Sequence, residues 1–177
     1  MHERVPFDIA AYERRTREGP CFVCAIARGE PEYRGPSHII YEDDDVLVFL
    51  NWYPTLPGYT LVCPRRHVER VVGDLTLDEY LLMQTWIYRV GRAIEQVVPT
   101  ERLYILSIGS QQGNRHVHWH VAACPPGLAY ADQQFAALMM SRGILDIPPD
   151  KMTDLASKIR GHVISQLGPA PERAGPG

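Results

Sequence analysis

The run HVHWHV at residues 116–121 constrains the fold more than any other part of the chain, because histidines alternate in it with apolar residues. Side chains on a β-strand point alternately to opposite faces. The run therefore predicts a strand with His116, His118 and His120 on one face and apolar side chains on the other. A half-buried strand with its polar side chains in solvent would explain a single histidine, but three in strict alternation indicate a site that uses them.

Two chemistries fit three neighbouring imidazoles. One is a catalytic metal site, in which histidines hold zinc and leave one coordination position open for water. Residues on the same face of a strand lie about 6.5–7 Å apart, so three in a row converge poorly on one ion. The other is covalent catalysis, in which a neutral imidazole attacks an electrophile while its neighbours orient it and stabilise the developing charge. Strand geometry favours the second chemistry and leaves the first open.

The other sequence patterns predict an α+β fold with a mostly antiparallel sheet. Thr76 and Glu79 form a capping box, and the apolar residues that follow recur at helical spacing, which predicts one long amphipathic helix over residues 77–97. Runs rich in β-branched and aromatic residues predict the strands. They lie at residues 38–42, 46–50, 59–64, 102–108 and 116–121.

Both ends of the chain have helical signals outside this sheet. Asp8 is placed to cap a short helix that Gly19 and Pro20 end, and apolar residues recur at helical spacing after Gly127. The last ten residues, GPAPERAGPG, have too few apolar side chains to offset the entropy of ordering. We therefore expect four parts: an N-terminal helical arm (1–20), a core domain (21–128), a C-terminal helical extension (129–167) and a disordered tail (168–177).

Charge and hydropathy exclude several classes of partner. The formal net charge of −3 gives no long-range attraction to a nucleic acid polymer. No apolar run approaches the roughly 20 residues that span a bilayer, and the charged N-terminus lacks the apolar segment of a secretory signal. We therefore expect a cytoplasmic protein with neither a membrane nor a nucleic acid partner.

Two of the four cysteines form the pair Cys21-x-x-Cys24, which is half of a metal site. In a reducing compartment this spacing indicates metal or redox chemistry ahead of a disulfide, and a reduced pair without metal remains an alternative. Cys63 and Cys124 fall in predicted strands, so we expect them to be small core residues.

The run HVHWHVA also resembles the pattern of the histidine triad (HIT) family. The segments CFVCAIARGE at 21–30 and IIYEDDDVLVFLNWYPTLPGYTLVCPRRHV at 39–68 occur in the order expected for bacterial members, so the resemblance covers about Cys21 to Pro126. It implies a HIT-like fold with an antiparallel five-stranded sheet, usually in a homodimer. It also implies an enzyme that binds an adenine nucleotide and cleaves it at the α-phosphate.

The resemblance assigns separate roles within the row. His118 attacks phosphorus and forms a nucleotidyl-histidine intermediate, His120 donates to the phosphate oxygens, and His116 orders the row or takes another partner. The implied substrates are dinucleoside polyphosphates or nucleoside phosphoramidates, and the loop around Asn51 is closer to the dinucleoside polyphosphate branch. Mg²⁺ accompanying the substrate phosphates is compatible with this chemistry.

The resemblance also suggests contacts to the nucleoside. Asn51 occupies the position of a polar side chain that contacts the ribose hydroxyls, although a turn residue ahead of Pro54 is the alternative. Phe49 and Leu50 are placed to flank the base, and their alternative role is core packing.

The phosphate side is less closely matched. Gln112 aligns with a glutamine that often contacts phosphates, but Gly113 stands where many relatives have serine or threonine. Gln111, Gln112 and Asn114 all remain candidate donors to phosphate.

For the metal, the resemblance implies that His67 and His116 complete a tetrahedral site with Cys21 and Cys24. Two thiolates and two imidazoles with no open position would form a structural Zn²⁺ site. An exposed His67 at a strand end is the alternative for that residue.

Three functional alternatives stay open beside the nucleotidyl hydrolase or transferase. One is a phosphorylase of the same substrates. Another is a nucleotide-binding or interaction protein with little turnover, which the altered residues before the triad would suit. The last is a triad that itself holds a catalytic metal.

Overall fold

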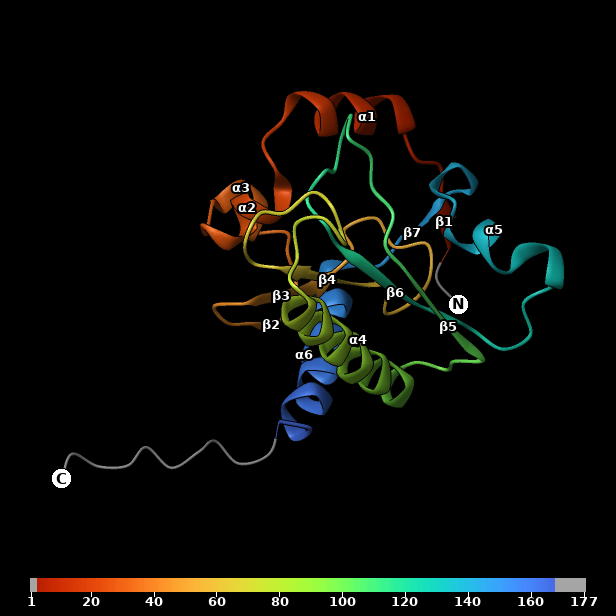
Figure 1. Cartoon of the computed structure of the whole chain (residues 1–177). Coiled ribbons are helices and arrows are strands. Elements are labelled where there is room, and N and C mark those ends of the chain that lie inside the picture. Colours follow the sequence, from red (N-terminus) through yellow and green to blue (C-terminus); the bar gives the residue numbers. More distant parts are fainter. Residues whose placement is uncertain (1–2, 168–177) are drawn as a thin grey trace.

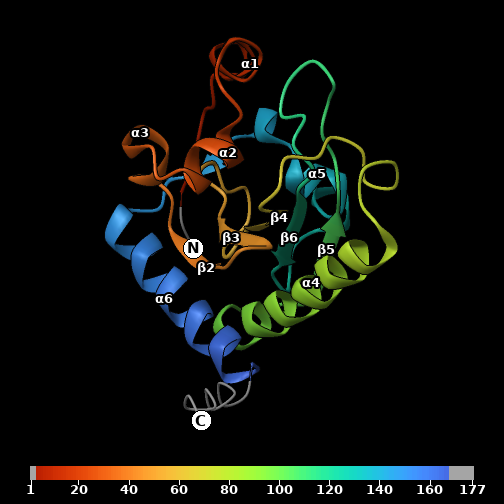
Figure 2. The same cartoon turned by 60° about the vertical axis from the view of Figure 1, so that its left-hand side comes forward.

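A five-stranded antiparallel sheet with the order β2-β3-β4-β6-β5 forms the centre of the computed structural model, which describes residues 3–167 (Figure 1). Its strands are β2 (Ile39–Glu42), β3 (Val46–Leu50), β4 (Thr60–Pro64), β5 (Arg102–Leu106) and β6 (Trp119–Cys124). Helices cover both faces of the sheet (Figure 2). The predicted α+β, HIT-like fold is therefore confirmed. The tail predicted to be disordered lies outside the described residues.

The hairpin of β2 and β3 turns at the acidic residues identified in the sequence. The side chain of Asp43 accepts hydrogen bonds from the backbone N–H groups of Asp45 at 2.9 Å and Val46 at 2.8 Å. This Asx-type turn satisfies backbone donors at the corner of the hairpin. Every residue of β3 and β4 is buried, as expected for central strands with both faces covered.

One face of the sheet packs on two long helices. In α4 (Leu77–Val97), the capping box is present: Thr76 and Glu79 each accept a hydrogen bond from the other's backbone N–H. α6 (Pro149–Ser165) packs against α4 and β2, and its buried Ile159 and Val163 belong to the same hydrophobic cluster as the buried face of α4. The C-terminal helix thus shares one core with the sheet, and the division of the chain into four parts stays a prediction.

The N-terminal helices lie on the other face. They are α1 (Ile9–Glu18), α2 (Phe22–Ala27) and α3 (Pro31–Arg34). Asp8 caps α1 by accepting from the backbone N–H of Ala11 at 2.9 Å, and the helix ends at Gly19 as predicted. The apolar side of α2 packs into a second cluster with Phe49 and Leu61 of the sheet.

A second, two-stranded sheet joins the start of the described chain to the segment just before α6. β1 (Arg4–Val5) pairs antiparallel with β7 (Ile144–Leu145), a pairing that no sequence pattern predicted. The guanidinium of Arg4 donates to the carbonyls of Gly143 at 2.8 Å and Thr55 at 2.7 Å. These contacts anchor the chain just before α1, which then runs across the loop between β5 and β6 (Figure 1).

Between β6 and α6 the chain is less helical than the sequence predicts. It forms the single-turn helix α5 (Phe135–Leu138) and two 3₁₀ turns, η1 (Tyr130–Asp132) and η2 (Met140–Arg142). Phe135 is exposed, so it supplies no packing to extend that helix. None of the helices within residues 3–167 combines the length and the apolar character needed to cross a membrane.

Candidate active site and metal cluster

The histidine row is extended, but only its last member lies in a strand. β6 begins at Trp119, so the predicted strand is wrong for the three residues before it. There, the backbone N–H of Val117 donates to the carbonyl of Val68 at 2.8 Å instead of joining the sheet. The side-chain alternation nevertheless holds. Val117 and Trp119 belong to the core beneath α4, whereas His118 and His120 line a cavity on the opposite face.

His118 is oriented by a backbone acceptor. Its Nδ1 lies 2.7 Å from the carbonyl oxygen of His116, and because a carbonyl only accepts, Nδ1 carries the proton and donates. Burial lowers the pKa of His118, so the ring is neutral near pH 7 and its Nε2 keeps a free lone pair. The edge of the ring packs against Phe22, with 5.8 Å between ring centroids. A neutral, fixed imidazole of this kind is equipped to act as a nucleophile.

His120 lies beside it, with the two ring centroids 4.7 Å apart. The hydroxyl of Tyr59 is 3.0 Å from Nδ1 of His120, and Nε2 is 3.4 Å from the carbonyl oxygen of Ile108. Nε2 therefore carries the proton, and Tyr59 donates to Nδ1. Burial, and then the neighbouring His118, lower the pKa of His120 to about 3. His120 is thus neutral, and its Nε2–H makes only a long hydrogen bond, to the carbonyl of Ile108.

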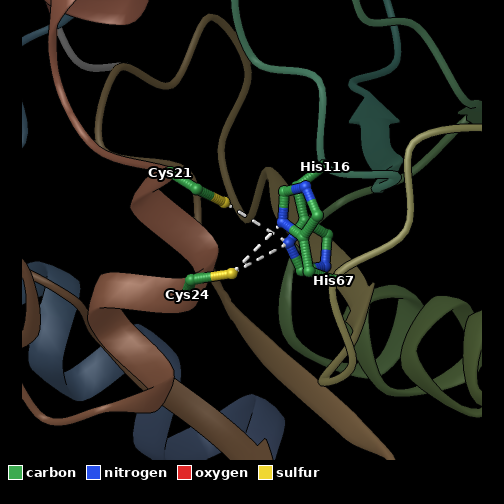
Figure 3. Close-up of side chains that lie close together, drawn as sticks. All are labelled: Cys21, Cys24, His67 and His116. Atoms are coloured by element: carbon green, nitrogen blue, oxygen red, sulfur yellow. Dashed lines mark hydrogen bonds between the residues drawn. The ribbon is translucent and has the colours of Figure 1, made fainter.

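His116 turns away from this pair and joins Cys21, Cys24 and His67 (Figure 3). One ligand atom from each residue lies within 4.8 Å of all the others. Nδ1 of His116 is 3.4 Å from Sγ of Cys21 and 3.6 Å from Sγ of Cys24, and Nδ1 of His67 is 3.3 Å from Sγ of Cys24. The four residues identified in the sequence as a metal set are therefore brought together. Two come from the start of α2, one from the loop after β4 and one from the loop before the neighbouring strand β6.

The hydrogen bonds around this cluster prepare both imidazoles as ligands. Nε2 of His116 donates to the carbonyl of Pro64 at 2.8 Å, and Nε2 of His67 donates to a carboxylate oxygen of Glu69 at 3.2 Å. Both rings consequently present an unprotonated Nδ1 to the cysteines, the outer-shell arrangement found around metal-bound histidines.

Burial, and then the neighbouring Cys21, raise the pKa of Cys24 to about 12. Both cysteines are half-buried, and two thiolates side by side there would need a cation to balance their charge. A Cys₂His₂ donor set of this geometry is consistent with Zn²⁺.

The triad by itself does not converge on one point. His116 faces the cysteines, His118 faces a backbone carbonyl and His120 faces Tyr59. Within residues 3–167, the cluster with Cys21 is the one group of three or more potential ligands whose atoms come close enough for an ion. The geometry therefore does not support the alternative in which the triad is a catalytic metal site.

A cavity of about 320 Å³ opens in front of His118 and His120. Its apolar wall is rich in aromatic rings, which come from Phe22, Tyr33, Phe49, Trp52 and Tyr53. Phe22 and Phe49 meet edge to face with 6.2 Å between centroids. Aromatic walls of this kind bind flat, apolar groups such as nucleobases by stacking.

Asn51 lines the cavity and also shapes its rim. Its Oδ1 accepts from the backbone N–H of Tyr53 at 2.9 Å, so the turn role applies, while its Nδ2 remains able to donate. Phe49 lines the cavity as well. Leu50 does not, because the alternation of β3 places its side chain in the core beneath α4.

The three polar residues expected on the phosphate side lie in three different surroundings. Asn114 lines the first cavity and donates through Nδ2 to the hydroxyl of Tyr12 at 2.7 Å. Gln112 accepts from Arg17 at 2.9 Å, and Gln111 lines a second cavity of about 210 Å³. Both cavities meet His116 and His118.

Several site residues were not predicted from the sequence. Tyr59 had no signal beyond its place in a predicted strand, yet its hydroxyl is the hydrogen-bond partner of Nδ1 of His120. α1 contributes to the cavity wall through Tyr12, Arg15, Thr16 and Arg17. A capped amphipathic helix gives no indication of the surface on which it packs, so no local signal could have assigned α1 to the site.

Comparisons with known proteins agree with this arrangement. The HIT domain model matches residues 33–124, which is slightly more than half of the chain. An uncharacterized HIT-like protein of Methanocaldococcus jannaschii is 44% identical over 103 residues, which cover 57% of this chain and 76% of that protein. The bis(5'-adenosyl)-triphosphatase of Dictyostelium discoideum is 31% identical over 97 residues, which cover 50% of this chain and 64% of that enzyme.

The fold has the same support. The crystal structure of a zinc-bound histidine triad family protein from Mycobacterium smegmatis superimposes with a TM-score of 0.62 at 24% identity, covering 83% of this chain and 94% of that one. The matched segment includes the whole five-stranded sheet and the row of three histidines. With its fold, its triad and its sequence in agreement, the chain belongs to the HIT domain family.

Proposed function

We propose that this protein is a nucleotidyl hydrolase or transferase that cleaves an adenine nucleotide at its α-phosphate, with His118 as the nucleophile. The observation that carries the proposal is the hydrogen bond from Nδ1 of His118 to the carbonyl of His116. It holds the ring in one tautomer and leaves the lone pair on Nε2, beside a cavity of nucleotide size with aromatic walls.

The reaction proceeds in two displacements. The lone pair of His118 Nε2 attacks the α-phosphorus, and the bond from phosphorus to the bridging oxygen or nitrogen breaks. The leaving group departs with that electron pair and takes up a proton from solvent. Water then attacks phosphorus, the P–N bond breaks, and the nucleoside monophosphate leaves while the lone pair of His118 is restored and a proton returns to solvent.

The neighbouring groups stabilise this transfer. Nε2–H of His120 donates to a non-bridging phosphate oxygen in place of its long contact with Ile108. Phe22, Phe49 and the other aromatic residues hold the base, and Nδ2 of Asn51 donates to the ribose. Substrate phosphates of this type commonly arrive with Mg²⁺, which would be part of the substrate.

His116 has no acid or base role in this scheme, because its Nδ1 faces the cysteines. We infer a structural Zn²⁺ held by Cys21, Cys24, His67 and His116. It would tie the start of α2 to the loop after β4 and the loop before β6. The zinc bound to the Mycobacterium smegmatis protein supports this inference. A homodimer and a cytoplasmic location also remain proposals from family membership.

The decisive experiment is a screen for AMP release. Diadenosine triphosphate, diadenosine tetraphosphate and adenosine 5'-phosphoramidate would be offered to the wild type and to His118→Ala. We expect turnover by the wild type alone and, after acid quenching, a nucleotidyl adduct on the peptide that contains His118. Full turnover by His118→Ala would end the covalent mechanism. Repeating the assay with added phosphate would separate hydrolysis from phosphorolysis by the product formed.

A second function is favoured by one observation. Oε1 of Gln112 accepts from Arg17 and Nδ2 of Asn114 donates to Tyr12, so α1 already holds the loop that carries these two candidate phosphate donors before a substrate arrives. A protein that binds nucleotide with little turnover would suit such a closed loop. Tight binding in calorimetry, together with no AMP release from any substrate of the screen, would favour this function over the enzyme.

A further inference from the structure

Three arginines line the cavity in front of His118, against one carboxylate. They are Arg15 and Arg17 of α1 and Arg115 directly before the triad, and Glu69 is the only acidic side chain among the described residues of the lining. The chain as a whole carries a net charge of −3. The basic character of the cavity is therefore a local property of this site.

The arginines are incompletely neutralised. Arg115 reaches Glu69 only at 4.0 Å, and Glu69 also accepts from His67 at 3.2 Å. Arg17 pairs with Glu13 at 2.7 Å and donates to Gln112. Arg15 has no ion pair with any residue between 3 and 167. A guanidinium without a carboxylate partner at the rim of a nucleotide cavity is available to bind phosphate.

Arg15 is held over the cavity by aromatic contacts. Its guanidinium carbon lies 5.2 Å from the ring centroid of Tyr53 and 5.6 Å from that of Tyr12. Tyr53 follows directly after the Asn51 turn, and its ring packs against Phe7 at 4.8 Å. These contacts place a positive charge above the same loop that lines the nucleoside part of the cavity.

α1 is also fitted closely to the loop before the triad. A Cβ atom on Gly113 would lie 2.9 Å from the hydroxyl of Thr16, so a larger side chain at this position would force α1 away. The hydrogen bond from Asn114 to Tyr12 closes the same gap. α1 lies outside the segment that matches the HIT domain model, so the model itself says nothing of this wall of the cavity.

We propose that α1 is one wall of the substrate site and that Arg15, with Arg17 and Arg115, binds the phosphates beyond the α-phosphate. This inference rests on the proposed function and narrows its substrate class. The preferred substrate is then a dinucleoside polyphosphate, whose leaving group is a negatively charged nucleoside phosphate or polyphosphate. The uncharged amine that leaves a phosphoramidate would not be bound by these arginines. Departure of a polyanion next to cations also offsets the charge that develops on the leaving oxygen.

The position of Arg15 in the last turn of α1 has another explanation, since basic residues there favour the helix dipole. Arg14, just before that last turn, provides the nearest control for charge on the helix. It is the adjacent residue in the same helix and does not line the cavity. Glutamine at either position keeps an unbranched polar side chain of similar helix propensity while removing the charge.

The test is equilibrium binding of AMP and of the α,β-methylene analogues of ADP and ATP, which this chemistry cannot cleave. We expect wild-type affinity to rise by about tenfold or more from AMP to the ATP analogue, as each added phosphate meets a cation. Arg15→Gln should reduce that rise by about three- to tenfold and leave AMP binding unchanged. Arg115→Gln should act in the same way without touching α1, and Arg14→Gln should stay within about twofold of the wild type.

These experiments distinguish a failure of the role assigned to Arg15 from a failure of the proposed function. Equal losses for AMP and the ATP analogue in Arg15→Gln would mean that Arg15 only holds α1 in place, which overturns the inference. An equal effect of Arg14→Gln, or no rise with added phosphates, would overturn it as well. In turnover assays, Arg15→Gln should lower kcat/KM for diadenosine triphosphate but not for adenosine 5'-phosphoramidate. If the wild type bound no nucleotide at all, the proposed function would fail together with the inference.

Discussion

On the face of the sheet that α4 and α6 cover, the buried side chains are apolar and belong to one hydrophobic cluster. On the opposite face, a smaller cluster around α2 leaves space for a cavity lined by histidines, aromatic rings and arginines. The residues from 117 to 121 contribute to both faces in alternation. The comparison teaches that one short segment can serve both the core and the site. Side chains on one of its faces pack in the hydrophobic core, and those on the other face line the cavity.

His116 is the exception that makes the comparison informative. It belongs to the same alternating row as His118, yet it is buried against Cys21 and Cys24 in the loop before β6. His118 donates to the backbone of His116, so the metal cluster and the nucleophile are mechanically linked. If this arrangement holds, substitutions should change activity, metal binding or stability one at a time.

The largest effect should follow from His118→Ala. We expect kcat/KM to fall by at least about ten-thousandfold, because the proposed nucleophile is removed, while the thermal midpoint changes little. Steady-state kinetics and thermal unfolding of the same preparation would check this. A comparable loss of stability would contradict the separation of the two faces.

Cys24→Ser should weaken zinc binding by about a thousandfold, since a thiolate ligand is replaced by a hydroxyl that holds zinc poorly. Metal content after dialysis against a chelator, measured by mass spectrometry, would show the loss. Cys63→Ala is the control, because Cys63 is buried within β4 and outside the cluster. That variant should lose stability but keep its zinc.

Ile159→Ala should destabilise the fold by about 3 kcal/mol, since a fully buried side chain on α6 would leave a cavity in the core. Urea unfolding gives the free energy directly. Phe135→Ala is the matched change on an exposed side chain of the same C-terminal region and should cost less than about 0.5 kcal/mol. Equal effects would mean that α6 contributes no more to the core than the exposed turn.

The smallest effect should come from Tyr12→Phe. It removes the hydroxyl that accepts from Asn114 and should cost about 1 kcal/mol locally. Amide hydrogen exchange in α1 should become about fivefold faster, with no change in exchange of α4. Uniform changes in both helices would show that α1 does not open independently.

Local signals account for the parts of the fold that were predicted. The capping box at Thr76, the Asp8 cap and the acidic turn before Val46 each involve residues within a few positions of one another. For that reason the long helix and the hairpin could be located in the sequence. The predicted start of the histidine strand is wrong, because the backbone partner of Val117 is Val68, which lies in a loop far away in the sequence.

The candidate site divides in the same way. The alternating histidines and the Cys21-x-x-Cys24 pair were visible, and resemblance to the HIT family joined the cysteines to His67 and His116. Leu50 was selected with Phe49 because both directly precede Asn51, but strand alternation places its side chain on the other face of the sheet. The arginines of α1 had no signal at all, since their relation to His118 depends on packing across about a hundred residues of chain.

By itself, the sequence determined the alternation of histidines, the family and the helix and hairpin signals, since each of these is a property of neighbouring residues. The resemblance only implied that His116 joins the cysteines. The tertiary structure decided it, together with the orientation of His118 toward the cavity, because separations such as the 95 positions between Cys21 and His116 are bridged only by packing. It also decided that β1 pairs with β7 and that α1 lies over the site. These contacts follow from how whole surfaces fit, and no local pattern encodes them.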